Sequence, residues 1–368
     1  KNFIRDHRQR GIESLLDEYP VFGRFLGIVW TFWLEQSVEM LERINRDREV
    51  LFHKFGVPMG VSIHRIQQGL SDPHRAGRVV SIITFVTTES TLRIVYKPKD
   101  LRVDQAYQEA LEDLNRHSDL FPLKTIAIHC GKGYGYVEHV PHVFCTTRLD
   151  LDRFYFNAGR PTAVLHVLGC TDCYYENLIA NFDHLVLIDT ETLLEDDLRD
   201  HVEEATAEID TSPISELRRR YLGSVLRSGL IPMWRFIGSQ DVAIDMSALG
   251  VHPPSKSTRL LPGWLALNSD GMMAGHVEQL AEVPTSLPMG IGSKNPFNSH
   301  IDRFCDGFTV ESHELIARRE EWLRPGGVLE RFSGFPRRVV FRMTRVYSAL
   351  QQQQLQPAAL RSRYLCRH

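Results

Sequence analysis

The chain has 368 residues, of which 43% are hydrophobic, enough to fill the core of one large domain or of two lobes. Its 43 basic and 46 acidic residues leave a formal net charge of -3, which excludes recruitment of nucleic acid or an anionic membrane by a global field. Six cysteines in so long a chain do not make a disulfide framework and favour a reducing cytoplasm.

Apolar residues recur at helical spacing from position 19 to position 55, and we predict helices there. Within this range, residues 25–34 (FLGIVWTFWL) form a continuous apolar run. The run is half the length of the ~20 residues that a bilayer span needs, so we interpret it as part of a buried helix.

Two β-rich runs follow, VVSIITFV and LRIVYK, and their spacing predicts a hairpin within residues 78–97. Pro98 ends the second run, and a helical pattern occupies residues 103–115. Strand-like runs return at 125–129 and 134–140, beside the Gly-rich segment 130–135 (CGKGYG). This segment lacks the G-x-x-x-x-G-K-[ST] of a P-loop and follows the β-rich run it would have to precede in a kinase, so we predict a turn.

The rest of the pattern is mainly helical, including residues 313–323 and the chain from 344 onward. A short strand at 185–189 and a Pro/Gly-rich loop at 284–296 interrupt it. The class expected is therefore α+β.

Lys97 ends a β-rich run, where a fixed cation can pair with the phosphates of a nucleotide. The helix that follows offers Glu109, with Glu112 as the less favoured choice, to hold this lysine in an ion pair as a kinase glutamate does.

Asp172 and Asn177 reproduce the D-x-x-x-x-N spacing of a kinase catalytic loop. In such a loop the aspartate reaches the attacking hydroxyl while the asparagine turns back to a magnesium ion. Asp189 then closes the strand 185–189, and Glu191 follows on the same side, which makes a carboxylate pair suited to one or two Mg²⁺ ions. The order and spacing together indicate a kinase-like fold.

Cys170 and Cys173 form a C-x-x-C pair, which would suit zinc or a redox reaction. A structural zinc site needs a second pair of ligands, and the sequence contains no second C-x-x-C. We favour the alternative of two small, semi-buried residues in a tight turn.

These motifs resemble those of the dehydratase domain of class II (LanM-type) lanthipeptide synthetases. Residues 71–78 (SDPHRAGR) are similar to that family's G-D-x-H-x-x-G-R, and residues 95–99 (VYKPK) to its VYKP-R/K. Residues 169–177 (GCTDCYYEN) resemble G-G-T-D-x-H-x-E-N, and residues 188–193 (IDTETL) resemble D-x-E-T-L. Further matches are 224–230 (SVLRSGL), 247–250 (SALG) and 337–347 (RRVVFRMTRVY).

The resemblance implies a two-lobed, lipid-kinase-like fold with additional N-terminal helices. Residues 1–142 would hold these helices and the nucleotide-binding lobe, and residues 143–368 a mainly helical lobe with the catalytic and metal-binding segments. Such a protein phosphorylates Ser and Thr of a ribosomally made precursor peptide with ATP and Mg²⁺, then eliminates phosphate to leave dehydroalanine or dehydrobutyrine. By position, the residues that would serve these steps are Lys97, Asp172, Asn177, Asp189 and Glu191 for phosphoryl transfer, Arg338 and Thr344 for elimination, and Asp72 and His74 for a step that stays unassigned.

Two departures from the family pattern bear on activity. The family's histidine two residues after the catalytic aspartate is Tyr174 here, and its second glycine is Cys170. Tyrosine cannot carry a positive charge near pH 7. The expected cyclase domain has no counterpart in this chain, so ring closure would need another domain or protein. Two alternatives stay open: a kinase that stops at the phosphopeptide, and a non-catalytic peptide-binding module.

Overall fold

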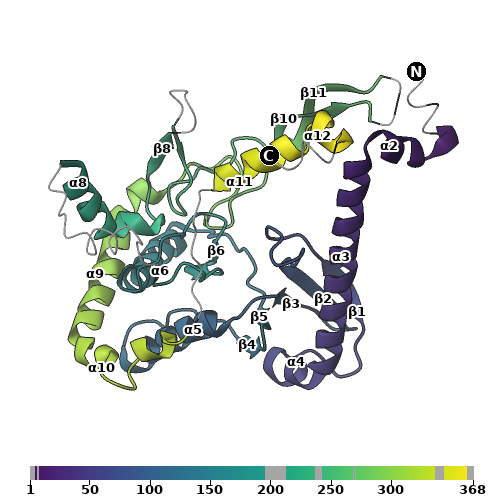
Figure 1. The fold of residues 1–368 in the computed structure, drawn as a ribbon. Helices are drawn as coiled ribbons and strands as arrows, with labels where there is room; N and C mark the ends of the chain where they lie inside the picture. The colour runs from purple at the N-terminus through teal and green to yellow at the C-terminus, as the bar shows by residue number, and fades with distance from the viewer. Residues whose placement is uncertain are drawn as a thin grey trace, which may run out of the picture. The chain divides into compact units, whose positions relative to one another are not determined.

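The computed structural model describes residues 5, 8–194, 213–236, 243–267, 269, 271–335 and 344–362. They form a mixed structure of helices and small sheets, which confirms the expected α+β composition (Figure 1). The chain divides into two compact units, one made of residues 1–93, 258–280 and 339–368, the other of residues 94–257 and 281–338. The two-lobed, kinase-like arrangement and its division at residue 142 stay predictions.

The first unit begins with helix α2 (Glu13–Glu18), which lies before the predicted range. Helices α3 (Pro20–Arg46) and α4 (Arg48–Phe55) follow, as the periodicity predicts. Gly56 ends α4 in the left-handed conformation, with φ of 69°, where a residue without Cβ is favoured. The predicted burial of the apolar run 25–34 is wrong for part of that run, since Val29 and Trp30 are each 65% exposed. The run is apolar on every side of the helix, so a helix covered on one side leaves some of it outside.

The strands of the first unit are β1 (Ile63–Gln67), which pairs antiparallel with β2 (Ser81–Val86), and the hairpin of β10 (Thr258–Leu265) and β11 (Met273–Leu280). Helices α11 (Thr344–Gln354) and α12 (Pro357–Arg361) follow. The β10–β11 hairpin is a correction, because we expected mainly helices between the strand at 185–189 and the loop at 284–296.

Strand β3 (Thr91–Lys97) enters the second unit at Ile94, and from there it pairs with β5 (Tyr134–Glu138), which pairs in turn with β4 (Ile128–Gly131). Lys97 lies opposite Gly135, where an added Cβ would come within 2.3 Å of the His129 carbonyl oxygen. The Gly-rich segment is the β4–β5 turn, as predicted, and Gly133 has φ of 76°.

The helices of the second unit are α5 (Arg102–His117), α6 (Arg148–Val167), α8 (Pro213–Leu222), α9 (Ile301–Ala317) and α10 (Arg319–Leu323). Two short hairpins join them, β6 (Leu178–Asn181) with β7 (His184–Leu187) and β8 (Trp234–Phe236) with β9 (Ala243–Asp245). The largest buried apolar cluster is built from α5, α6, the β6–β7 hairpin and α9.

Helices α6 and α9 pack backbone to backbone. An added Cβ on Gly159 would lie 2.1 Å from the Phe304 carbonyl oxygen, and one on Gly307 would lie 1.9 Å from that of Phe156. Beside this contact, the guanidinium of Arg160 pairs with Glu311 at 2.7 Å, and both side chains are at most 1% exposed. The crossing therefore depends on two glycines and one buried ion pair.

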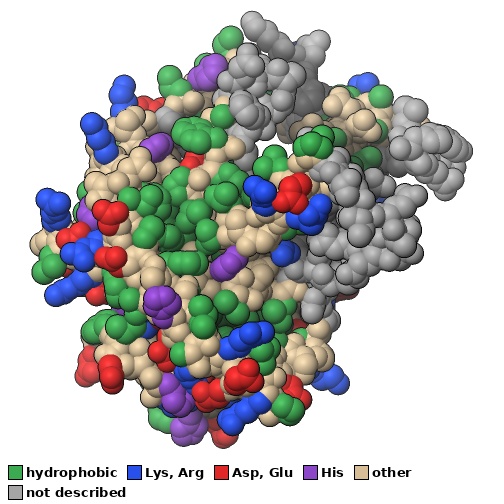
Figure 2. Space-filling model, turned by 90° about the vertical axis from the view of Figure 1, so that its left-hand side faces the viewer, with side chains coloured by type: hydrophobic (Ala, Val, Ile, Leu, Met, Phe, Trp, Pro, Cys, Tyr) green, Lys and Arg blue, Asp and Glu red, His purple; other side chains and the backbone are tan. Residues whose placement is uncertain are grey.

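Among the residues described, none of the helices is both long and apolar enough to cross a membrane. On the face drawn in Figure 2, acidic and basic side chains are interspersed around a central group of apolar ones. The described part of this face thus carries no extended patch of one charge, in keeping with the near-zero net charge.

Candidate active site

The loop 169–177 lies between α6 and β6 and carries the predicted catalytic pair. Gly169 turns the chain at the end of α6 with φ of 60°. The side-chain amide of Asn177 donates to the carboxylate of Asp172 at 3.1 Å and to its backbone oxygen at 2.8 Å. The structure therefore brings Asp172 and Asn177 together.

The segments 224–230 and 247–250 flank this loop. The amide of Cys173 donates to the carbonyl of Ser228 at 2.8 Å, and Tyr174 bridges to Ser247 as in an antiparallel ladder. The Tyr174 ring lies against Gly229, where an added Cβ would come within 2.8 Å of it. Both motif segments thus act as supports that fix the backbone of the catalytic loop.

The β6–β7 hairpin sets the carboxylates of residues 189 and 191 beside that loop. Leu178 pairs with Leu187, and the amide of Ile188 donates to the carbonyl of Asn177 at 2.9 Å. Asp189 is the next residue, so the hairpin brings the end of the D-x-x-x-x-N segment next to the start of D-x-E.

Lys97 reaches the same place from the end of β3. Its ammonium donates to the carbonyl of Ile188 and lies 3.3 Å from Asp104, and both charged side chains are less than 10% exposed. Glu109, the expected partner, instead lies 3.7 Å from Arg331 and accepts a hydrogen bond from Gln105. The carboxylate beside Lys97 is therefore one turn nearer the start of α5 than we expected.

Lys99, like Asp104, is a residue of this site that our sequence analysis did not single out. Its ammonium lies 2.7 Å from Asp189 and 2.9 Å from Glu191. Burial alone would lower the pKa of Lys99, but Asp104, Asp189 and Glu191 outweigh burial and raise it above its ordinary value. Burial would likewise raise the pKa of Asp189, but Lys99 and Lys97 lower it, so the Asp189 carboxylate and the Lys99 ammonium are both ionised at neutral pH.

The oxygen donors fit a magnesium ion that is also held by a nucleotide. Asp189 and Glu191 are bridged by one ammonium, which places a carboxylate oxygen of each around a single cation position. The amide nitrogen of Asn177 is turned toward Asp172, so its carbonyl oxygen is left as an acceptor. Within the described ranges no group of three or more His, Cys, Asp and Glu side chains could hold a metal alone, and Mg²⁺ in nucleotide sites needs only one or two carboxylates.

The side chains of Cys170 and Cys173, the two cysteines of the loop, are in contact with each other. Their sulfur atoms are 3.2 Å apart, and both side chains are buried. The hydrogen bond with Cys173 lowers the pKa of Cys170, with help from Thr192, whereas the same contact and burial raise the pKa of Cys173. The expected semi-buried pair is thus a fully buried dithiol next to Asp172.

The other predicted residues belong to the first unit or fall outside the described residues. Asp72 and His74 belong to the first unit, on an exposed loop in which His74 bridges to Arg78 across three successive residues of positive φ, Arg75, Ala76 and Gly77. Arg338 lies outside the described residues. Thr344 is the first residue of α11, and its side chain is outside the description.

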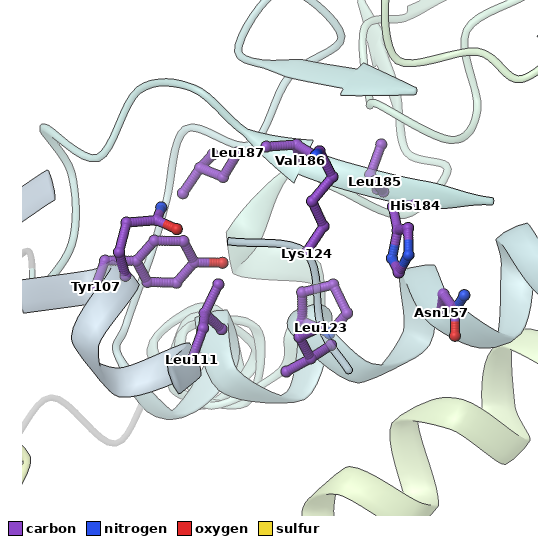
Figure 3. A pocket seen from close by; sticks show the side chains of 11 residues that line it. Tyr107, Leu111, Leu123, Lys124, Asn157, His184, Leu185, Val186 and Leu187 are labelled. Atoms are coloured by element: carbon purple, nitrogen blue, oxygen red, sulfur yellow. The ribbon is translucent and has the colours of Figure 1, made fainter. Parts of the chain in front are cut away.

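A separate pocket lies between α5 and β7, with Tyr107 and Leu111 on one side, His184 on the other and Lys124 between them (Figure 3). Burial and the neighbouring Lys124 lower the pKa of His184 despite Asp183, so its imidazole is neutral near pH 7. None of the candidate reacting groups lines this pocket.

Comparison with known proteins gives two similarities. A family model described as "Domain of unknown function (DUF4135)" matches residues 19–367. The "Lacticin 481/lactococcin biosynthesis protein LcnDR2" of Lactococcus lactis subsp. lactis is 21% identical over 195 residues. The matched segment is 50% of this chain and 20% of that relative, so the similarity spans a minor part of the relative's length.

Proposed function

The chain belongs to the family described as a domain of unknown function, DUF4135, and we propose that it dehydrates lanthipeptide precursor peptides. It uses ATP to phosphorylate Ser and Thr side chains and then eliminates the phosphate. The name of the Lactococcus relative supports the class of substrate. The resemblance of the motifs to LanM-type dehydratases supports the reaction.

One observation carries the proposal. The Lys97 ammonium donates to the carbonyl of Ile188, whose own amide donates to the carbonyl of Asn177. Three segments far apart in the sequence therefore meet at one point: the lysine strand, the catalytic loop and the carboxylate pair. A peptide-binding surface has no need of this arrangement, whereas phosphoryl transfer needs all three groups together.

In the proposed first step, the Asp172 carboxylate accepts the proton of the peptide hydroxyl. The hydroxyl oxygen attacks the γ-phosphorus of ATP, the bond from that phosphorus to the bridging oxygen breaks, and ADP leaves. Asn177 holds Asp172 in place by its amide hydrogen bond. Asp189, Glu191 and the side-chain carbonyl oxygen of Asn177 would hold Mg²⁺, which when bound would neutralise phosphate charge. Lys97 is locked between Asp104 and β7 and offers a fixed positive charge to the nucleotide.

The second step removes the α-proton of the phosphorylated residue to a base, breaks the Cβ–O bond and leaves a Cα–Cβ double bond and free phosphate. Hydroxide is a poor leaving group, whereas a phosphate departs readily once cations neutralise its charge. By resemblance we assign the elimination to Arg338 and Thr344, whereas Asp72 and His74 stay without an assigned step.

The test is mass spectrometry of a Ser/Thr-rich precursor peptide, ideally one encoded beside this protein, after incubation with the protein, Mg²⁺ and ATP. Losses of ~18 Da per modified residue establish the dehydratase, and gains of ~80 Da show phosphorylation alone. Asp172→Asn should abolish both mass changes. Asp119→Asn, a carboxylate on an exposed loop after α5, is the matched control and should retain activity.

A specific observation favours the second candidate, a kinase that stops at the phosphopeptide. The position that carries an imidazole in the family is Tyr174, whose ring packs on Gly229 and whose backbone bridges to Ser247. A phenol so placed cannot supply a positive charge. Accumulation of phosphopeptide would identify this candidate, and no modification together with no Mg-ATP binding would indicate a binding module.

A further inference from the structure

The cation position between Asp189 and Glu191 is occupied by a side chain of the protein itself. The Lys99 ammonium lies 2.7 Å from one carboxylate and 2.9 Å from the other. We propose that Lys99 is an exchangeable internal cation. Its ammonium holds the carboxylate pair until a divalent cation binds together with a nucleotide, and it then moves to contact the nucleotide phosphates. This inference rests on the nucleotide site of the proposed function.

The two lysines on either side of Pro98 differ in a way that fits such an exchange. Lys97 is 8% exposed and is held by Asp104 and the Ile188 carbonyl. Lys99 is 22% exposed, and within the described part of the chain its hydrogen bonds go to the two carboxylates that a metal would take. Lys97 is thus held by contacts outside the carboxylate pair, whereas the two hydrogen bonds of Lys99 both go to that pair and its four-carbon stem is flexible.

Charge makes the two cations competitors. Mg²⁺ sits about 2.0–2.1 Å from its oxygen ligands, so an ammonium in hydrogen-bond contact with the same oxygens lies within a few ångströms of it and repels it. A metal that binds alone must displace Lys99 from the carboxylates, and nothing replaces the hydrogen bonds that the ammonium then loses. A metal that arrives with ATP also supplies phosphate oxygens, which offer the displaced ammonium new partners.

The consequence is that Lys99 should affect two affinities in opposite directions. It weakens binding of a divalent cation alone, because it already neutralises part of the carboxylate charge. It strengthens binding of the metal–nucleotide complex, because it then contacts phosphate. Lys99 in this way couples binding of the metal to binding of the nucleotide.

The experiment is calorimetric titration of the full chain with Mn²⁺ alone and, separately, with Mn²⁺ and a non-hydrolysable ATP analogue. Lys99→Met should bind Mn²⁺ alone at least about tenfold more tightly than the unaltered protein and bind the analogue at least about tenfold more weakly. Lys99→Arg keeps the charge and should leave Mn²⁺ binding close to that of the unaltered protein. Lys132→Met, an exposed lysine in the β4–β5 turn, is the matched control and should change neither affinity.

Circular dichroism of each variant, with and without Mn²⁺, verifies the fold, and Lys99→Gln replaces Lys99→Met if the latter unfolds. Unchanged or weaker Mn²⁺ binding by the charge-removing variant, or none by either protein, overturns the inference. If the unaltered protein binds no nucleotide, the proposed function fails. The Mn²⁺ affinities of the two proteins still show whether Lys99 competes with a divalent cation for the carboxylates. If nucleotide binds and Lys99→Met matches the unaltered protein, the inference fails while the function stands.

Discussion

Replacement of Arg160 by methionine should destabilise the second unit more than any surface change. The substitution would leave the Glu311 carboxylate, which is 0% exposed, without the guanidinium that now lies 2.7 Å away, and would remove the donor that Arg160 offers to the Phe121 carbonyl. Breaking a buried ion pair from one side costs about 3–5 kcal/mol of unfolding free energy. We expect that loss for Arg160→Met in urea denaturation followed by circular dichroism.

The double variant Arg160→Met/Glu311→Leu separates the cost of an unpaired charge from loss of packing. With both charges gone, we expect it to be at least about 2 kcal/mol more stable than Arg160→Met, because buried pairs are often replaced by apolar residues at little cost. Arg303→Met, on the same helix as Glu311, is the control. The pair of Arg303 with Asp306 is more than half exposed, so this substitution should change stability by at most about 1 kcal/mol.

The pH dependence gives a second check on the same reasoning. Burial raises the pKa of Glu311 above its ordinary value, although Arg160 opposes the shift. Without Arg160 the pKa in the folded protein rises further, so stability falls as pH increases from the unfolded value through the raised one. The deficit of Arg160→Met should therefore be larger at pH 8 than at pH 5. Equal stabilities of the single and double variants would refute the unpaired-charge argument.

Three further changes should have measurable effects. Hydrogen bonds from Thr147 lower the pKa of Asp150, which caps α6, so the contribution of this carboxylate is full at neutral pH and is lost as pH falls through the lowered value. Melting curves of Asp150→Asn should thus differ from the unaltered protein at pH 7 and converge in acid. Gly307→Ala should cost about 1–3 kcal/mol or more in urea unfolding, and an unchanged midpoint would contradict the backbone contact. The oxidant diamide should join Cys170 to Cys173, as thiol titration and peptide mapping would show, and slow phosphorylation until a reductant is added; full activity of the cross-linked protein would contradict a role for loop geometry.

The regular part of the fold could be read from the sequence because its hydrophobic periods are clear. The helices at 20–55 and 102–117 and the β4–β5 turn follow from spacing and from Gly133. The β10–β11 hairpin could not be read in this way. Pro262 and two glycines interrupt its alternation, and most of the hairpin is exposed, so no buried face imposes a period of two.

The candidate site was predictable where chemistry depends on local spacing, as for Asp172 and Asn177. It was not predictable where the partner is set by packing. Asp104 and Glu109 are five residues apart, which turns their side chains by about 140° around the helix, so only one of them can face Lys97. The first turn of α5 lies against Lys97, and that contact depends on the tertiary structure.

The crossing of α6 and α9 has a consequence for how the chain reaches its folded state. Arg160 and Glu311 are 151 positions apart, and the catalytic loop and both hairpins of the second unit lie between them in the sequence. Contacts of such long range require closure of a large loop, which is entropically costly and slows folding. The glycines at the crossing allow contact only once the two helix backbones have met. We therefore expect the group formed by the two lysines, Lys97 and Lys99, and the carboxylates of residues 189 and 191 to become ordered late, after α9 has been synthesised and has docked on α6.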